Sequence, residues 1–175
     1  MIRLSYLRLY LAVCLSGLAF ATVAAAQAPV LFDGTAPVVF GFQTAPSDDA
    51  IPRGLLVTPA ELAKSLTSAT AQKPLLLQVG SRSLYTQAHI PGSEFIGATS
   101  SEAGRQQLRQ RVKGLPHNTS IVIYCGCCPW GNCPNIHPSY QELHSLGFRN
   151  VKVLYIADNF GTDWVDKGYP VAKGD

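Results

Sequence analysis

Four cysteines within nine residues are the part of this sequence best suited to chemistry. They stand at positions 125, 127, 128 and 133, directly after the apolar run Ile121–Tyr124 and before a helical pattern over residues 135–146. A thiol between the end of a strand and the N-terminus of a helix faces the backbone N–H groups of the loop and the positive end of the helix dipole. Both favour a thiolate or an anionic persulfide. Cys125, the first residue after the strand, is therefore the predicted nucleophile.

The rest of the loop has several candidate roles in sulfur chemistry. Cys127, Cys128 and Cys133 are candidate resolving thiols, which release bound sulfur or reduce a disulfide. Gly126 supplies a backbone N–H to the loop that would cradle the sulfur, and Trp130 is a candidate lid over the site or a docking aromatic.

Two other interpretations of the same loop stay open. Cys125 could form a disulfide with Cys133, and the loop could then act in dithiol exchange with other proteins. Thiolates at this spacing also suit Cu(I) or zinc, although the spacing matches none of the common zinc patterns. The candidate metal ligands are Cys125, Cys127, Cys128, Cys133 and His137.

The N-terminus predicts export. Met1–Ala26 has the features of a cleaved signal peptide: basic Arg3 and Arg8, the apolar run Leu9–Phe20, and a small-residue cleavage site at Ala24–Ala26. The apolar run is short for a membrane span, which favours cleavage over an anchor. We therefore expect a periplasmic or secreted protein with no membrane attachment after cleavage.

Export bears on the cysteines and on the charge. Four cysteines remain in the mature chain, and an oxidising compartment allows three pairings between them. Rings closed within one loop are short and add little stability, so the clustering favours a chemical role.

The formal charge of +3 falls to +1 without Arg3 and Arg8, which gives no electrostatic case for nucleic acid.

The remaining chain predicts one α/β domain. Residues 27–54 are predicted to form a linker or N-terminal arm, with Val38–Phe40 as a short strand candidate, and residues 55–175 to form the domain. Strands are predicted at Leu75–Val79, Glu94–Ile96, Ile121–Tyr124 and Val151–Tyr155, and helices at Pro59–Leu66, Ser83–Ala88, Ser101–Val112, Ile136–Leu146 and Thr162–Asp166. Capping patterns support three of the helices: Thr58 with Glu61, Thr99 with Glu102, and Asn135 as an N-cap.

Alternating strands and helices predict a three-layer parallel sheet with helices on both faces. Ligands of such sheets bind at the carboxyl ends of the strands, which is where Cys125 stands.

At this point the sequence resembles the rhodanese-like family over Leu55–Val171. The residues that carry the resemblance are the strand Leu75–Val79, the turn His89–Gly92, the strand ending in Cys125, Leu143, Gly147–Phe148, Val151–Leu154, Trp164 and Gly168–Val171. The resemblance implies a sulfurtransferase in which Cys125 takes sulfane sulfur from thiosulfate or a polysulfide as a persulfide. The acceptor would be a small thiol or a protein thiol, and no cofactor is implied apart from the Cu or Zn of the metal alternative.

The sequence departs from the family at the predicted site. Gln78 and Gly80 occupy positions where the family usually has an acid and an arginine, which leaves Arg82 as the candidate substrate-binding cation. The loop after Cys125 and the segment Val153–Trp164 are longer than usual, which predicts a remodelled site mouth. The arginine that phosphatase relatives need is absent from the loop, which argues against that activity.

Overall fold

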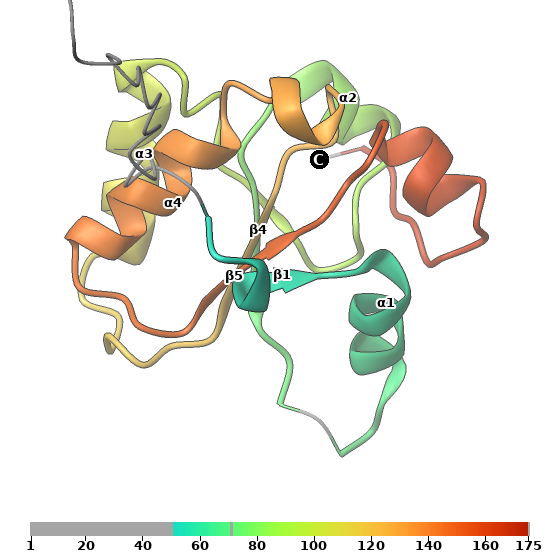
Figure 1. Cartoon of the computed structure of the whole chain (residues 1–175), viewed down its shortest axis with the longest axis horizontal. Coiled ribbons are helices and arrows are strands. Elements are labelled where there is room, and N and C mark those ends of the chain that lie inside the picture. The colour runs from blue at the N-terminus through green and yellow to red at the C-terminus, as the bar shows by residue number, and fades with distance from the viewer. Residues whose placement is uncertain (1–50, 71, 175) are drawn as a thin grey trace, which may run out of the picture. The chain divides into compact units, whose positions relative to one another are not determined.

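The computed structural model describes residues 51–70 and 72–174 (Figure 1). The predicted signal peptide at residues 1–26, the strand candidate Val38–Phe40 and the linker up to residue 50 lie outside this part. Ile51 is buried in the core, ahead of the predicted domain start at Leu55. Within the described residues, no helix has the length and apolar character needed to cross a membrane.

A five-stranded parallel sheet forms the centre of the fold, as predicted. The strands are β1 (Leu56–Val57), β2 (Leu75–Gln78), β3 (Glu94–Phe95), β4 (Ile121–Tyr124) and β5 (Val151–Leu154), in the order β1-β5-β4-β2-β3. All four neighbouring pairs are parallel, and β4 is the middle strand. The four predicted strands are confirmed to within one residue, whereas β1 is too short to give a pattern and was not predicted.

Helices cover both faces of the sheet, which makes the predicted three layers. They are α1 (Pro59–Thr67), α2 (Arg82–Gln87), α3 (Glu102–Val112), α4 (Ile136–Ser145) and a single π-helical turn, Gly161–Val165. Side chains of α3 and α4 pack against one face, and those of α1 and the π-turn pack against the other. Figure 1 shows α3 and α4 together on one side of the sheet and α1 on the other.

Local capping signals explain where two of the helices begin. Thr58 and Glu61 form the predicted capping box at the start of α1. The predicted pairing of Thr99 with Glu102 is wrong, because Ser101 caps α3 by accepting a hydrogen bond from the Gly104 N–H. Thr99 is fully buried and its hydroxyl donates to the Asn135 carbonyl, 2.6 Å away.

The alternation along β4 decides which way Cys125 points. Ile121 and Ile123 belong to the core under α3 and α4, while Val122 and Tyr124 belong to the opposite core. Cys125 continues this alternation and joins the core under α4. The first loop residue therefore faces the helix to which the same loop leads.

Candidate active site

A tight turn folds the chain back directly after Cys125. Gly126 has φ = 82°, a conformation that strains any residue with a Cβ. A Cβ at this position would also lie 2.6 Å from the Cβ of Phe160, whose N–H donates to the Gly126 carbonyl. Glycine is required here, and the turn brings residue 127 back toward residue 125.

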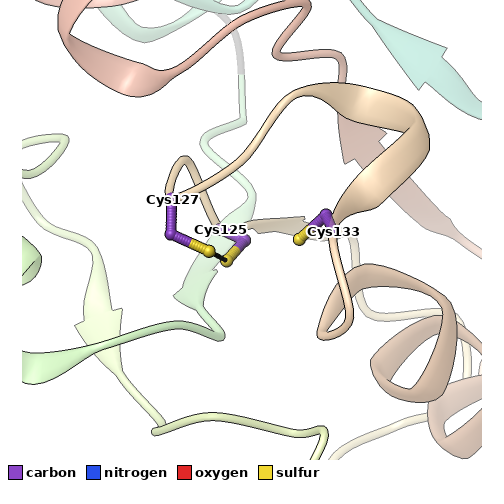
Figure 2. A group of neighbouring side chains, drawn as sticks. All are labelled: Cys125, Cys127 and Cys133. Carbon is purple, nitrogen blue, oxygen red and sulfur yellow. Dashed lines mark hydrogen bonds between the residues drawn. The ribbon is translucent and has the colours of Figure 1, made fainter.

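The loop gathers sulfur atoms into one cluster. The Sγ atoms of Cys125 and Cys127 are 3.1 Å apart, and those of Cys127 and Cys128 are also 3.1 Å apart. The Sγ atoms of Cys125, Cys127 and Cys133 all lie within 4.8 Å of one another, and all four cysteines are free thiols. Figure 2 shows the sulfurs of Cys125 and Cys127 pointing toward each other and Cys133 approaching from the other end of the loop. We call Cys125, Cys127 and Cys133 the thiol cluster.

Asn135 links the thiol cluster to the neighbouring loop, a role that the sequence did not predict. It occupies the predicted N-cap position of α4, but its side chain makes no capping hydrogen bond. Instead Oδ1 accepts from the Ser100 N–H at 3.0 Å, and Nδ2 donates to the Sγ of Cys125 at 3.4 Å and of Cys127 at 4.0 Å. The residue is only 5% exposed, so these bonds are shielded from water. The sequence feature that could have indicated this role is the position of Asn135 two residues after Cys133.

The end of β2 holds the backbone of Cys125. Gln78 is 2% exposed, and its Nε2 donates to the Cys125 carbonyl at 3.3 Å while its Oε1 accepts from the Gly80 N–H at 3.2 Å. A Cβ at Gly80 would lie 3.0 Å from the Cys125 sulfur. The two positions that depart from the family pattern therefore fix Cys125 and leave room for its side chain.

Hydrogen bonding shifts the pKa values of Cys125 and Cys133 in opposite directions. The pKa of Cys133 is lowered, first by the hydrogen bond from the Cys125 thiol and then by the backbone N–H groups of Asn135 and Ile136 at the start of α4. The pKa of Cys125 is raised by the same interaction and by burial. The pKa of Cys128 is raised to about 11, mainly by its hydrogen bond with Cys127. The backbone N–H groups at the start of α4 are thus directed at Cys133, while Cys125 remains the predicted nucleophile.

A cavity of about 310 Å³ opens onto two of the sulfurs. Cys125 and Cys127 line it, together with apolar side chains that include Leu84, Phe160 and Val165. Among the described residues, no lysine, arginine, aspartate or glutamate lines this cavity. Asn159 and Gly161, from the long segment after β5, also form its wall, so this segment contributes to the site mouth.

The other predicted site residues lie around this centre. Trp130 is half-buried and packs on Tyr155, with ring centroids 5.2 Å apart, and it lines a small void together with Cys128 and Cys133. Arg82 holds its guanidinium 4.1 Å from the centroid of the Phe95 ring and does not line the cavity. Of the five predicted metal ligands, Cys125, Cys127 and Cys133 lie close enough together to hold one metal ion. Cys128 and His137 do not belong to this group.

Comparisons with known proteins agree with this architecture. A family model described as rhodanese-like domain matches residues 58–155. A search of curated protein sequences finds none that matches the chain.

Solved structures share the fold at low sequence identity. The crystal structure of the Alr3790 protein from Anabaena sp. is 19% identical, with a TM-score of 0.51 over 67% of this chain and 82% of that one. The solution structure of the rhodanese-like domain of Alr3790 is also 19% identical, with a TM-score of 0.50 over 68% and 79% of the two chains. A thiosulfate sulfurtransferase from Pseudomonas aeruginosa is 23% identical, with a TM-score of 0.50 over 70% of this chain and 20% of that one.

Proposed function

Because the chain belongs to the rhodanese-like family, we propose that it is a sulfurtransferase in which Cys125 carries sulfane sulfur as a persulfide. The observation that carries the proposal is the position of Cys125, which follows the middle strand of a parallel sheet and opens onto a cavity. This is the edge of the sheet where such folds bind their ligands.

The proposed reaction has two displacement steps. Cys125 passes its proton to the adjacent Cys133 thiolate, and the Cys125 thiolate attacks the outer sulfur of a donor R–S–SH. The S–S bond of the donor breaks, RS⁻ leaves, and Cys125 becomes a persulfide. An acceptor thiolate then attacks the outer sulfur of the persulfide and regenerates the Cys125 thiolate.

Two groups favour charge on the Cys125 sulfur during these steps. The Nδ2 of Asn135 donates a hydrogen bond to it, and the backbone N–H of Cys127 lowers its pKa. Hydrogen bonds to ionised acceptors are about twice as strong as those between neutral groups. Both donors therefore stabilise the charged states more than the resting thiol.

Intact-mass spectrometry tests the proposal. Reduced Cys127→Ser protein, which lacks the thiol in contact with the Cys125 sulfur, should gain the mass of one sulfur atom when treated with inorganic polysulfide, and the gain should be lost when Cys125→Ser is added. Cys128→Ser is the matched control, because it removes a thiol of the same loop that lies outside the thiol cluster. If no donor adds mass to Cys127→Ser, or if the variant that also carries Cys125→Ser still gains sulfur, the proposal is wrong.

The three sulfurs of the thiol cluster favour one alternative function, the binding of Cu(I) or zinc. Sulfurs within 4.8 Å of one another can reach a common metal ion with small side-chain rotations. Anaerobic titration with Cu(I) should then give stoichiometric binding that is lost in Cys133→Ser and kept in Cys128→Ser. Micromolar or weaker affinity would reject this function, since thiolate sites bind far more tightly.

We also propose that the protein is exported and acts in the periplasm or outside the cell. The support is the charge and apolar pattern of Met1–Ala26. Mass analysis of the protein isolated from a secreting host should show a mature N-terminus at Gln27. A full-length chain starting at Met1 would contradict cleavage.

A further inference from the structure

We propose that Cys127 resolves the Cys125 persulfide by attacking the Cys125 sulfur, which forms a Cys125–Cys127 disulfide and expels hydrosulfide into the cavity. The inference rests on the proposed function, since it needs a persulfide at Cys125. It adds a second catalytic residue and a different product, because sulfane sulfur leaves as sulfide.

The first support is proximity. The Sγ atoms of Cys125 and Cys127 are 3.1 Å apart, which brings an attacking thiol into contact with its target before any movement. The turn at Gly126 creates this contact, and it can be built only with glycine because a Cβ would collide with Phe160.

The second support is that the cavity distinguishes Cys127 from the other two candidates. Of Cys127, Cys128 and Cys133, only Cys127 lines the cavity onto which Cys125 opens. Cys133 is 8% exposed and lies three residues before α4, outside the lining of this cavity. Cys128 lies outside the thiol cluster. Hydrosulfide expelled between Cys125 and Cys127 has a path to solvent through the cavity.

The step balances without a further reactant. The Cys127 thiol passes its proton to the anionic outer sulfur of the Cys125 persulfide, and the Cys127 thiolate attacks the inner sulfur of the resulting Cys125–S–SH. A Cys125–Cys127 bond forms, and the bond to the outer sulfur breaks with both electrons going to HS⁻. Cys127 is oxidised to the level of a disulfide, and the expelled sulfur is reduced to sulfide. A further turnover requires an external dithiol, which reduces the disulfide by thiol exchange.

A single-turnover experiment tests the step. The reduced full-length mature protein is mixed anaerobically with one equivalent of an alkyl hydropersulfide, with no thiol acceptor, and both intact mass and free sulfide are measured. The wild-type protein should lose the mass of two hydrogen atoms and release one equivalent of sulfide, and peptide mapping should find a Cys125–Cys127 disulfide. Cys127→Ser should instead retain the mass of one added sulfur and lose sulfide release.

Controls separate this inference from the proposed function. Cys128→Ser should behave like the wild type, and Cys127→Ala repeats the test in case the serine variant does not fold. A wild-type persulfide that persists without sulfide release, or a disulfide that maps to Cys133, would overturn the role of Cys127. If even Cys127→Ser and Cys127→Ala gain no sulfur, the proposed function itself fails.

Discussion

Replacing Asn135 with alanine should slow persulfide formation and also lower the free energy of unfolding. The side chain joins two loops, since Oδ1 accepts from the Ser100 N–H and Nδ2 donates to the Cys125 sulfur. Asn135→Ala leaves the Ser100 N–H without this acceptor, which should cost about 1–3 kcal/mol of stability. It also removes an N–H donor from the sulfur on which charge develops.

The size of the kinetic effect follows from the charge on the sulfur. A hydrogen bond to a charged group contributes about 1.5–3 kcal/mol, whereas the resting Cys125 is a protonated thiol that accepts more weakly. The difference appears in the transition state, and at about 1.4 kcal/mol for each factor of ten it predicts a loss of roughly ten- to one-hundredfold. The assay is the rate constant for gain of one sulfur, with a polysulfide donor and in the Cys127→Ser background.

Thr99→Val is the matched control. Thr99 donates to the Asn135 carbonyl, which keeps a second partner in the Ser139 N–H, and it makes no hydrogen bond to sulfur. This variant should lose about 0.5–1.5 kcal/mol of stability, measured by denaturant unfolding, and retain its loading rate. If both variants lose rate equally, or if Asn135→Ala loads as fast as the wild type, the N–H···S bond has no catalytic role.

Three further predictions address the turn, the cavity and the thiol cluster. Gly126→Ala should cost about 2–5 kcal/mol of unfolding free energy, because alanine is strained in the left-handed backbone conformation and its Cβ collides with Phe160. Gly92→Ala is the control: with φ = 78° and open space around it, it should cost only about 1–2 kcal/mol. Equal costs for the two variants would rule out the collision. Since no charged side chain of the described residues lines the cavity, an alkyl hydropersulfide should load Cys125 faster than thiosulfate, and Gln87→Arg should raise the thiosulfate rate about two- to fivefold while Gln87→Ala does not. Under reducing conditions the free energy of unfolding should rise with pH between the lowered pKa of Cys133 and the ordinary thiol value of about 8.5, because the folded state binds fewer protons than the unfolded state. At higher pH it should fall, because Cys125 keeps its proton in the folded state. A pH dependence that is unchanged in Cys133→Ser would contradict this.

The sequence predicted what depends on local pattern. The run Leu75–Val79 reads as a buried strand because both faces of a parallel sheet are covered, and Ile121–Tyr124 places Cys125 at a strand end for the same reason. The arrangement of the thiol cluster depends on contacts that no local pattern reports. Asn135 reads as a helix cap in any local window, yet its Oδ1 bonds Ser100, 35 residues earlier in the chain.

Among the described residues, no cationic side chain lines the cavity, and this bears on the choice of donor, on the charge of the thiol cluster and on the resolving step. The N–H donors that face these sulfurs are neutral groups, the Asn135 side-chain amide and the backbone N–H groups of Cys127, Asn135 and Ile136, and among the three cluster thiols it is the pKa of Cys133 that is lowered. Once Cys133 has taken the Cys125 proton, an anionic persulfide at Cys125 would hold its charge in a site of low dielectric with no cation beside it, which is costly. Formation of the Cys125–Cys127 disulfide removes that charge as hydrosulfide and leaves two neutral sulfurs. A cluster of thiols without a counter-ion therefore favours the release of sulfide over the storage of a persulfide.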